Sequence, residues 1–220
     1  MIVIDGALRD LIPSAALGVL TCTADVAADS PEQLAEFDDL IRRLETVYPD
    51  LPSVARNPRV AATRAAYKAV GKDPSKYRNS AEAMLRRVAK KNGLYRVNNA
   101  VDANNMISIE SGYSLGSYDL AAVSGQIVFK ATPDGEQYRG IGKDVLNIER
   151  LPALYDDAGV FGNPTSDSRR TMIGAGAGRR LLYVIYAFDG GADLPLWLEK
   201  TAELLKKYCS AVIGETRIVR

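Results

Sequence analysis

Hydrophobic residues follow two different spacings along this chain of 220 residues. Before about residue 100, apolar side chains recur every three or four positions, which is the period of a helix buried on one side. Later in the chain, short apolar and β-branched runs lie between turn signals, which is typical of strands. We expect a turn of helix at 7–12 and helices at 30–48, 58–70, 79–92 and 193–208. We expect strands at 2–4, 17–27, 125–131, 138–141, 145–148, 151–155 and 180–188, and a final strand made of 211–213 with 217–219. This separation favours an α+β fold over a doubly wound α/β fold.

Turn signals give the expected connections. Residues 50–57 are predicted to form a loop, and Asp134-Gly135 predicts a hairpin between the strands on either side. The run RLLYVIYAF is the strongest signal for a buried strand. Its tyrosines, Tyr183 and Tyr186, lie three residues apart, so they point to opposite sides of a strand and cannot both face one core.

The stretch 95–119 mixes polar and apolar residues more closely than any other part of the chain. A surface loop would not carry so many apolar residues, and a core strand would not carry so many amides, because each buried amide needs several hydrogen-bond partners. We therefore expect the stretch to line a pocket or to fix a turn, with 98–106 running from a strand into a short helix. Its polar residues include Asn98, Asn99, Asp102, Asn104 and Asn105.

Composition excludes several classes of chemistry. The chain is 47% hydrophobic, 25% charged and has a net charge of +1, so a nucleic-acid contact would need a local basic cluster. There is no histidine, which rules out Ser-His-Asp and Cys-His nucleophiles. Cys22 and Cys209 are far apart and are expected to be reduced thiols. We expect no metal, no cofactor, no leader peptide, no membrane span and a cytoplasmic location.

A local basic cluster is present at 56–96, where acidic residues are few. One interpretation is contact with the phosphates of RNA, and the other is a solvated helix face whose long side chains cover apolar surface. The cations on the predicted third helix that we assign to RNA binding are Arg86, Arg87, Lys90 and Lys91.

Three further motifs each allow two interpretations. The sequence from Gly174 to Gly178 (GAGAG) is either a phosphate-binding loop or a flexible turn, and it lacks the ending of a P-loop. The segment 163–168 (NPTSDS) could contact a substrate or form a series of Asx and Ser/Thr turns. Asp102 and Asp119 could be a catalytic couple, or each could cap backbone amides locally.

Residues 98–119 carry a family resemblance. The stretch NNAVDANNMISIESGYSLGSYD resembles the motif of the B3/B4 domain in the beta subunit of bacterial phenylalanyl-tRNA synthetase, and the likeness continues over about residues 76–190. The resemblance implies an α+β fold with mixed β-sheets and packed helices. It also implies a B3/B4-like domain at 76–220, with residues 1–75 as a strand and helical extension packed on it. The matching motif positions are Asn98, Asn99, Val101, Asp102, Asn105, Gly112, Leu115, Tyr118 and Asp119.

In that family the domain edits tyrosine wrongly attached to tRNA, so the resemblance implies a pocket for aminoacyl-tRNA. Asn105 matches a pocket asparagine, Asn104 stands where the family has threonine, and Gly162 matches a glycine that lines the pocket. Gly116 falls where the family has a histidine. The family's glutamate, which reads the tyrosine hydroxyl, has no counterpart between Asp167 and Asp189. Without that partner, selectivity for tyrosine is not expected.

The leading hypothesis is an editing-like domain that binds tRNA or aminoacyl-tRNA and hydrolyses a mischarged ester with a positioned water. The alternatives are a non-catalytic RNA-binding module, and a protein that binds a small amino-acid-like ligand. No catalytic residue is assigned. The expected substrate-binding residues are Asn98, Asn99, Asp102, Asn104, Asn105, Gly116, Asp119, Gly162, Thr165, Ser166 and Asp167.

Overall fold

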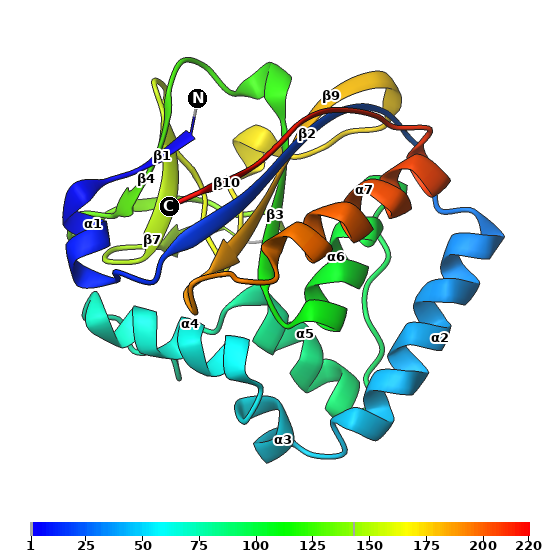
Figure 1. Cartoon of the computed structure of the whole chain (residues 1–220), viewed down its shortest axis with the longest axis horizontal. Helices are drawn as coiled ribbons and strands as arrows, with labels where there is room; N and C mark the ends of the chain where they lie inside the picture. The colour runs from blue at the N-terminus through cyan, green and yellow to red at the C-terminus, as the bar shows by residue number, and fades with distance from the viewer. Residues whose placement is uncertain (1, 143) are drawn as a thin grey trace.

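Strands from both ends of the chain meet in two β-sheets in the computed structural model, which describes residues 2–142 and 144–220 (Figure 1). The helices are α1 (Gly6–Leu11), α2 (Pro31–Val47), α3 (Leu51–Ala55), α4 (Pro58–Ala69), α5 (Ser80–Ala89), α6 (Asn99–Ser111) and α7 (Leu194–Cys209), with the 3-10 turns η1 (Leu120–Ala122) and η2 (Arg169–Thr171). The strands are β1 (Ile2–Ile4), β2 (Ala16–Val26), β3 (Ser114–Asp119), β4 (Ile127–Ala131), β5 (Gln137–Arg139), β6 (Val145–Asn147), β7 (Pro152–Asp156), β8 (Gly159–Gly162), β9 (Gly176–Ala187) and β10 (Val212–Val219). The fold is α+β, as predicted.

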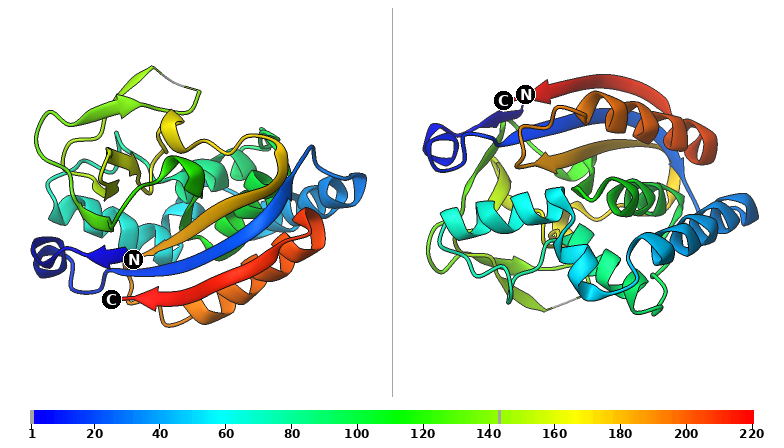
Figure 2. Two further views of the ribbon diagram at one scale, coloured as in Figure 1. Left: turned by 90° about the horizontal axis from the view of Figure 1, so that it is seen from above. Right: turned by 60° about the horizontal axis from the view of Figure 1, so that its bottom comes forward.

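The larger sheet has the order β10-β2-β9-β3 and is antiparallel throughout. Its long central pair, β2 and β9, runs in register from Ala16 opposite Ala187 to Ala24 opposite Arg179. The smaller sheet has the order β1-β4-β7-β8 and is mixed, because β1 lies parallel to β4. Figure 2 shows β10, β2 and β9 side by side, with the two chain ends close together. The first 26 residues thus supply a strand to each of these two sheets, and β5 and β6 pair separately.

Both faces of the larger sheet are buried, which explains the two tyrosines of β9. Tyr183 packs with α6 and α7 on one face. Tyr186 packs on the other face against the smaller sheet, with its ring centroid 5.6 Å from that of Phe129. A strand between two apolar layers has no polar side, so its sequence is a continuous apolar run.

Helix α6 passes through the middle of the helical layer and is surrounded by protein. Its apolar residues contact the larger sheet on one side, through Ile107, and the helices α2, α3 and α5 on the other, through Met106 and Ile109. A helix enclosed in this way has no polar stripe, so the spacing of its apolar residues gives no clear period. The prediction of a strand leading into a short helix at 98–106 was therefore wrong: one helix begins at Asn99 and ends before Gly112, which has a φ of 81°.

Other predicted connections also differ from the structure. Residues 50–57 contain α3, where Asp50 and Ser53 form a reciprocal capping box. The turn at Asp134-Gly135 does not join two paired strands, because β4 pairs with β1 and β7 while β5 pairs with β6. Strand β9 begins at Gly176, so the GAGAG segment is a turn only in part. Strands β3 and β8 were not predicted.

Among the described residues, no helix combines the length and the apolar character that crossing a bilayer requires.

Candidate functional site

A pocket of about 400 Å³ opens between the segment that precedes α5, the strand β6 and the residues between β6 and β7. One wall is apolar and the opposite wall is the polar turn after β8. Its mouth carries two cationic side chains, Lys76 and Arg78, both exposed. Its volume lies in the range of small-molecule sites. The lining residues are Lys76, Tyr77, Arg78, Ala83, Val145, Leu146, Asn147, Ile148, Leu151, Asn163, Thr165 and Ser166.

The polar wall is fixed by an Asx turn. Oδ1 of Asn163 accepts hydrogen bonds from the backbone N–H groups of Thr165 (2.8 Å) and Ser166 (3.1 Å). Two tyrosines hold it from behind: Tyr67 shares a 2.8 Å hydrogen bond with the Thr165 hydroxyl, and Tyr138 donates to the carbonyl oxygen of Ser166. The Asx-turn interpretation of this segment is thus confirmed, and the turn forms the rigid wall of a pocket.

Behind the wall lies a cluster of buried phenols around Asp167. The Tyr118 hydroxyl donates to Asp167 Oδ1 (2.8 Å) and lies 2.5 Å from the Tyr186 hydroxyl. Burial raises the pKa of Asp167 to about 7, although the hydrogen bonds from Tyr118 and from the backbone of Asn163 partly offset that rise. Asp167 therefore changes its charge near neutral pH, directly behind the polar turn.

Gly116 and Gly162 stand on either side of the Tyr118 phenol. A Cβ atom added at either position would overlap the Tyr118 hydroxyl and ring. Tyr118 is fully buried, and its ring meets Phe161 edge-on at 5.0 Å between centroids. Neither glycine has a positive φ, so the close approach of the phenol is the reason for glycine at both positions. The chain thus fills the space beside Gly116 with its own side chain.

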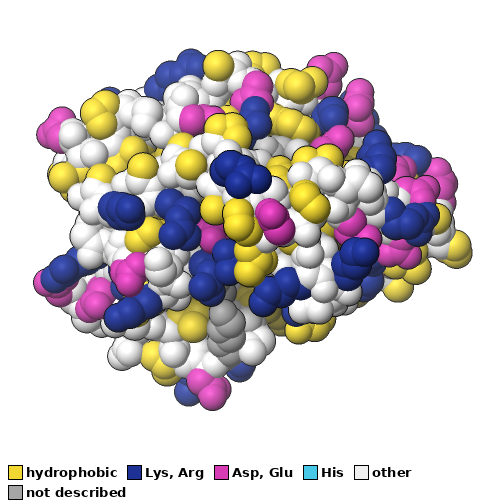
Figure 3. Space-filling view, turned by 90° about the horizontal axis from the view of Figure 1, so that it is seen from below, with side chains coloured by type: hydrophobic (Ala, Val, Ile, Leu, Met, Phe, Trp, Pro, Cys, Tyr) yellow, Lys and Arg dark blue, Asp and Glu magenta, His cyan; other side chains and the backbone are white. Residues whose placement is uncertain are grey.

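A buried carboxylate organises the cations next to the pocket. Glu82 on α5 is 1% exposed, and Arg64 Nη1 donates to both of its oxygens at 3.0 and 3.1 Å. Arg78 and Arg86 lie at 4.0 and 3.7 Å from Oε1, close enough for ionic attraction but too far for a hydrogen bond. Lysine and arginine side chains gather across the middle of the face shown in Figure 3.

The predicted residues of α6 form a separate group. Asn98 caps the helix by accepting from Val101 N, at 2.9 Å. Asn99 accepts from Ala27 N (3.0 Å) and donates to the carbonyl oxygens of Asp25 (3.0 Å) and Tyr208 (2.9 Å). These bonds join α6 to the end of β2 and to α7. In the described part of the chain no hydrogen bond links these two asparagines to the pocket.

Asp102 and its neighbours also serve local structure. Asp102 is fully buried and accepts from Val97 N and from Asn105 Nδ2 (3.3 Å). Burial, and then the charge of Asp29, raise the pKa of Asp102 to about 7. Asn104 donates to the carbonyl oxygen of Leu115 at 3.5 Å. The structure therefore brings Gly116, Gly162, Thr165, Ser166 and Asp167 together. Of the predicted residues on α6, Asn104 reaches β3 at Leu115, next to Gly116.

Asp119 is at the end of β3. It caps η1 through Ala121 N (3.0 Å) and forms an ion pair with Arg179. No contact joins Asp119 to Asp102 among the described residues, so the two carboxyl groups are not a couple. In the GAGAG segment, Gly178 N donates to Asp25 Oδ1 at 2.8 Å, which fastens the start of β9 to β2.

The four predicted RNA-binding cations differ in their surroundings. Arg86 lies beside Glu82, at 3.7 Å. Arg87 donates to the carbonyl oxygens of Asn92 and Gly93, where α5 ends. Lys90 and Lys91 are exposed beyond the last turn of α5. Their assignment to RNA binding stays a prediction.

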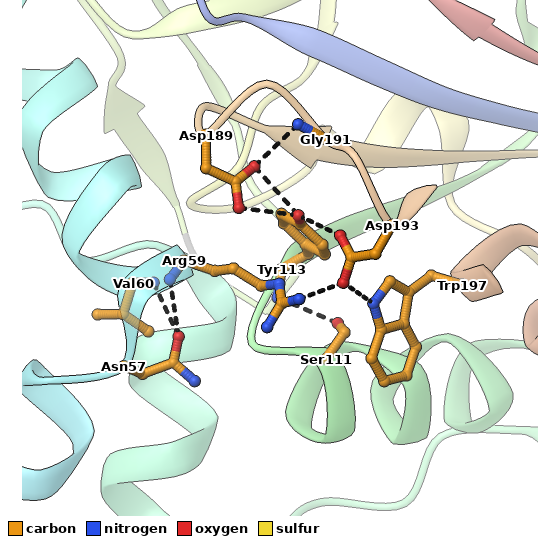
Figure 4. Close-up of polar contacts among 9 residues, drawn as sticks. All are labelled: Asn57, Arg59, Val60, Ser111, Tyr113, Asp189, Gly191, Asp193 and Trp197. Carbon is orange, nitrogen blue, oxygen red and sulfur yellow. Dashed lines mark hydrogen bonds and ion pairs between the residues drawn. The ribbon is translucent and has the colours of Figure 1, made fainter. Parts of the chain in front are cut away.

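A second polar cluster joins α4, the connection between α6 and β3, and the start of α7, and nothing in the sequence pattern indicated it (Figure 4). The Tyr113 hydroxyl lies 2.9 Å from Asp189 Oδ2 and 2.7 Å from Asp193 Oδ1. Asp193 also pairs with Arg59 and accepts from Trp197 Nε1 at 2.8 Å. The single hydroxyl proton of Tyr113 cannot be donated fully to both carboxylates, so Asp189 and Asp193 repel each other. The positive charge of Arg59 reduces that repulsion.

No group of three or more His, Cys, Asp or Glu side chains that could hold a metal ion occurs within residues 2–142 and 144–220.

Comparison with known proteins adds a family model, one curated relative and one solved structure. A family model described as B3/4 domain matches residues 62–190. The phenylalanine--tRNA ligase beta subunit of Cutibacterium acnes (strain DSM 16379 / KPA171202) is 28% identical over 161 residues, which cover 58% of this chain and 18% of that relative. A solved N-terminal fragment of the phenylalanyl-tRNA synthetase beta subunit from Pyrococcus horikoshii aligns with a TM-score of 0.48 and 11% identity, over 100% of this chain and 50% of that one. The match thus spans less than a fifth of the curated relative's length.

Proposed function

The chain belongs to the B3/4 domain family, and on that premise we propose that it binds the 3′ end of a tRNA or aminoacyl-tRNA in the pocket beside α5. The relative that it matches is a subunit of a tRNA ligase, which makes RNA of this class the first candidate. The proposal rests on one observation: a pocket with a rigid polar wall has cations at its mouth.

The two walls suit different parts of such a ligand. The Asx turn gives the pocket a fixed polar surface at Thr165 and Ser166, so little order is lost on binding. The Ser166 hydroxyl has no hydrogen-bond partner within the described residues and can donate to a ligand. Lys76 and Arg78 at the mouth favour an anionic backbone.

Binding is tested by titrating labelled tRNA at several salt concentrations. We expect affinity to fall steeply with salt, and Lys76→Glu to weaken binding and flatten the slope. Lys206→Glu is the matched control, because it changes the net charge equally from an exposed position on α7. Equal effects of the two variants, or binding that is insensitive to salt, would count against the proposal. Lys90→Glu with Lys91→Glu tests the predicted contribution of the end of α5.

The editing version of the proposal adds hydrolysis of a mischarged ester. The ester bond of an aminoacyl-tRNA is activated, so a water held beside it by the Ser166 hydroxyl would suffice without a nucleophilic residue. The test is deacylation of a panel of mischarged tRNAs by the wild type and by Ser166→Ala and Asn105→Ala. Release equal to background in all three proteins would eliminate hydrolysis and leave binding alone. Release above background that Ser166→Ala does not lower would eliminate the role of the Ser166 hydroxyl.

The small-molecule alternative makes a different prediction. The pocket volume of about 400 Å³ also suits an amino-acid-like ligand. In that case free amino acids would raise the melting temperature, and tRNA would not bind.

A further inference from the structure

The cations around Glu82 carry more positive charge than the carboxylate can balance. Three guanidinium groups lie within 4.0 Å of Glu82, so the cluster has an excess of two positive charges beside the pocket. Arg78 itself lines the pocket, and Lys76 adds a further positive charge. The carboxylate of Asp73, which interacts with Lys76 and Arg64, balances one of these charges and leaves the group net positive. An excess of this kind favours a bound anion.

The three arginines around Glu82 differ in whether their N–H groups make hydrogen bonds. Arg64 makes both hydrogen bonds to Glu82, which satisfies the buried carboxylate. Arg78 and Arg86 are held by ionic attraction alone, and within the described residues neither guanidinium makes a hydrogen bond. Their side chains are 45% and 27% exposed. The guanidinium of Arg78 is therefore held near Glu82 by charge and still has its N–H groups to offer, which suits a phosphate.

The same buried group connects the cations to the polar wall. Glu82 lies close enough to Tyr67 for its charge to contribute to raising the pKa of that phenol, although burial is the larger cause. Tyr67 in turn holds the Thr165 hydroxyl at 2.8 Å. Glu82 is therefore near both the cations and the tyrosine that holds the polar wall.

The rest of the pocket suits the organic part of a nucleotide. Leu146, Ile148 and Leu151 form an apolar surface, and Thr165 and Ser166 supply polar groups opposite to it. A nucleotide fits these surfaces, because its flat base can lie against the apolar wall while its phosphate lies at the cationic mouth.

We propose that the pocket binds a nucleoside monophosphate unit, with its phosphate on Arg78 and Lys76, and that Glu82 is the positioning residue that orients the guanidinium groups. This deepens the proposed function, on which it rests for the RNA source of the nucleotide. The same chemistry is present in a free nucleotide and in the last residue of an RNA chain.

The test compares AMP with adenosine by calorimetry on the intact protein. We expect AMP to bind at least about tenfold more tightly, because a charge-assisted contact to phosphate is worth at least that factor. Arg78→Gln should remove most of this preference and leave adenosine binding unchanged. The matched control Lys206→Gln should change neither affinity. The dinucleotide ApA, which presents a phosphodiester, serves as the RNA-terminus arm.

Glu82→Gln tests the positioning role. A loss of folding would weaken both ligands together, so the readout is the ratio of AMP to adenosine affinity, which should fall while adenosine still binds. Arg78→Gln, at an exposed side chain, carries the test if Glu82→Gln does not fold. Equal binding of AMP and adenosine, or a ratio unchanged in Arg78→Gln, would overturn the inference.

The outcomes separate this inference from the proposed function. If tRNA binds and Arg78→Gln changes neither its affinity nor its salt slope, the RNA proposal stands and the phosphate site is wrong. If AMP binds through Arg78 and tRNA does not bind, the phosphate site stands and the protein takes a free nucleotide.

Discussion

The Tyr118 hydroxyl donates a 2.8 Å hydrogen bond to Asp167 Oδ1, in a space closed on both sides by glycine. Its oxygen also lies 2.5 Å from the Tyr186 hydroxyl, so one carboxyl group and two phenols share a few hydrogen bonds inside the protein. Burial costs less free energy for a neutral carboxyl group or phenol than for a charged carboxylate. The protonation of Asp167 is therefore linked to stability.

The first prediction concerns pH. The pKa of Asp167 rises from its ordinary 3.8 to about 7 in the folded protein, so between these values the folded state binds more protons than the unfolded state. The free energy of unfolding should fall as pH rises from about 4 to 7 and then level off. Part of the Asp167 side chain is exposed, so we expect this fall to be on the order of 2 kcal/mol. The pKa of Asp102 is also raised, so Asp102 contributes to the same fall in the free energy of unfolding.

Urea unfolding at pH 5 and pH 8 measures this dependence. Asp167→Asn should reduce the difference between the two pH values, and the residual difference should shrink further with Asp102→Asn. Greater stability of the wild type at pH 8 than at pH 5 would contradict the assignment.

The second prediction concerns Gly116. Ala at this position would place a methyl group in the volume of the Tyr118 phenol, so Gly116→Ala should cost about 2 kcal/mol or more of stability. A control is Gly174→Ala, since nothing lies within 4 Å of a Cβ there. Adding Tyr118→Ala should remove the clash, so a double-mutant cycle with no coupling would refute the explanation.

The third prediction separates the asparagines of α6. Asn99→Ala removes three hydrogen bonds that join α6, β2 and α7, and should cost about 2–3 kcal/mol. Asn105→Ala removes one 3.3 Å bond from a partly exposed side chain, and should cost about 0.5 kcal/mol. Thermal melts of the two variants decide this, and equal losses would show that the three contacts of Asn99 carry no special weight.

The fourth prediction concerns the cluster of Figure 4. Burial would raise the pKa of Asp193, but the hydrogen bonds from Tyr113 and Trp197 and the charge of Arg59 outweigh it and lower the pKa. This stabilisation is present above the ordinary carboxyl pKa and is lost as pH falls through the folded value.

Arg59→Met should therefore cost about 1–2 kcal/mol at pH 7, with a smaller difference from the wild type near pH 3. Arg42→Met, which breaks the exposed pair with Asp39, should cost less than about 0.5 kcal/mol. A cost for Arg59→Met that does not change with pH would indicate lost packing alone.

The sequence pattern predicted helices that are buried on one face and elements that are bounded by clear capping or turn residues. Helix α2 is an example, with Ser30 as its cap and Pro31 in its first turn. Helix α3 was missed although its signal was present, because Asp50 and Ser53 form a capping box over a helix of only 5 residues. Helix α6 could not be recognised from its period, since protein surrounds it.

Local sequence patterns did not indicate which strands pair with each other. The turn at Asp134-Gly135 is a good hairpin signal, yet β4 lies between β1 and β7, which are far from it in sequence. The same limit applies to the site. The motif included Tyr118, but nothing in it indicated that this phenol fills the space between β3 and β8 and donates to Asp167.

The order β10-β2-β9-β3 also constrains how the chain acquires its fold during synthesis. Strand β2 is complete at Val26, but its partners end at Ala187 and Val219. Until these segments leave the ribosome, an apolar strand of 11 residues has both edges unpaired. The sheet can therefore form only slowly, through contacts between residues far apart in sequence, and the nascent chain needs protection from aggregation meanwhile. Chaperone depletion should lower its soluble yield more than that of proteins whose contacts are mainly local.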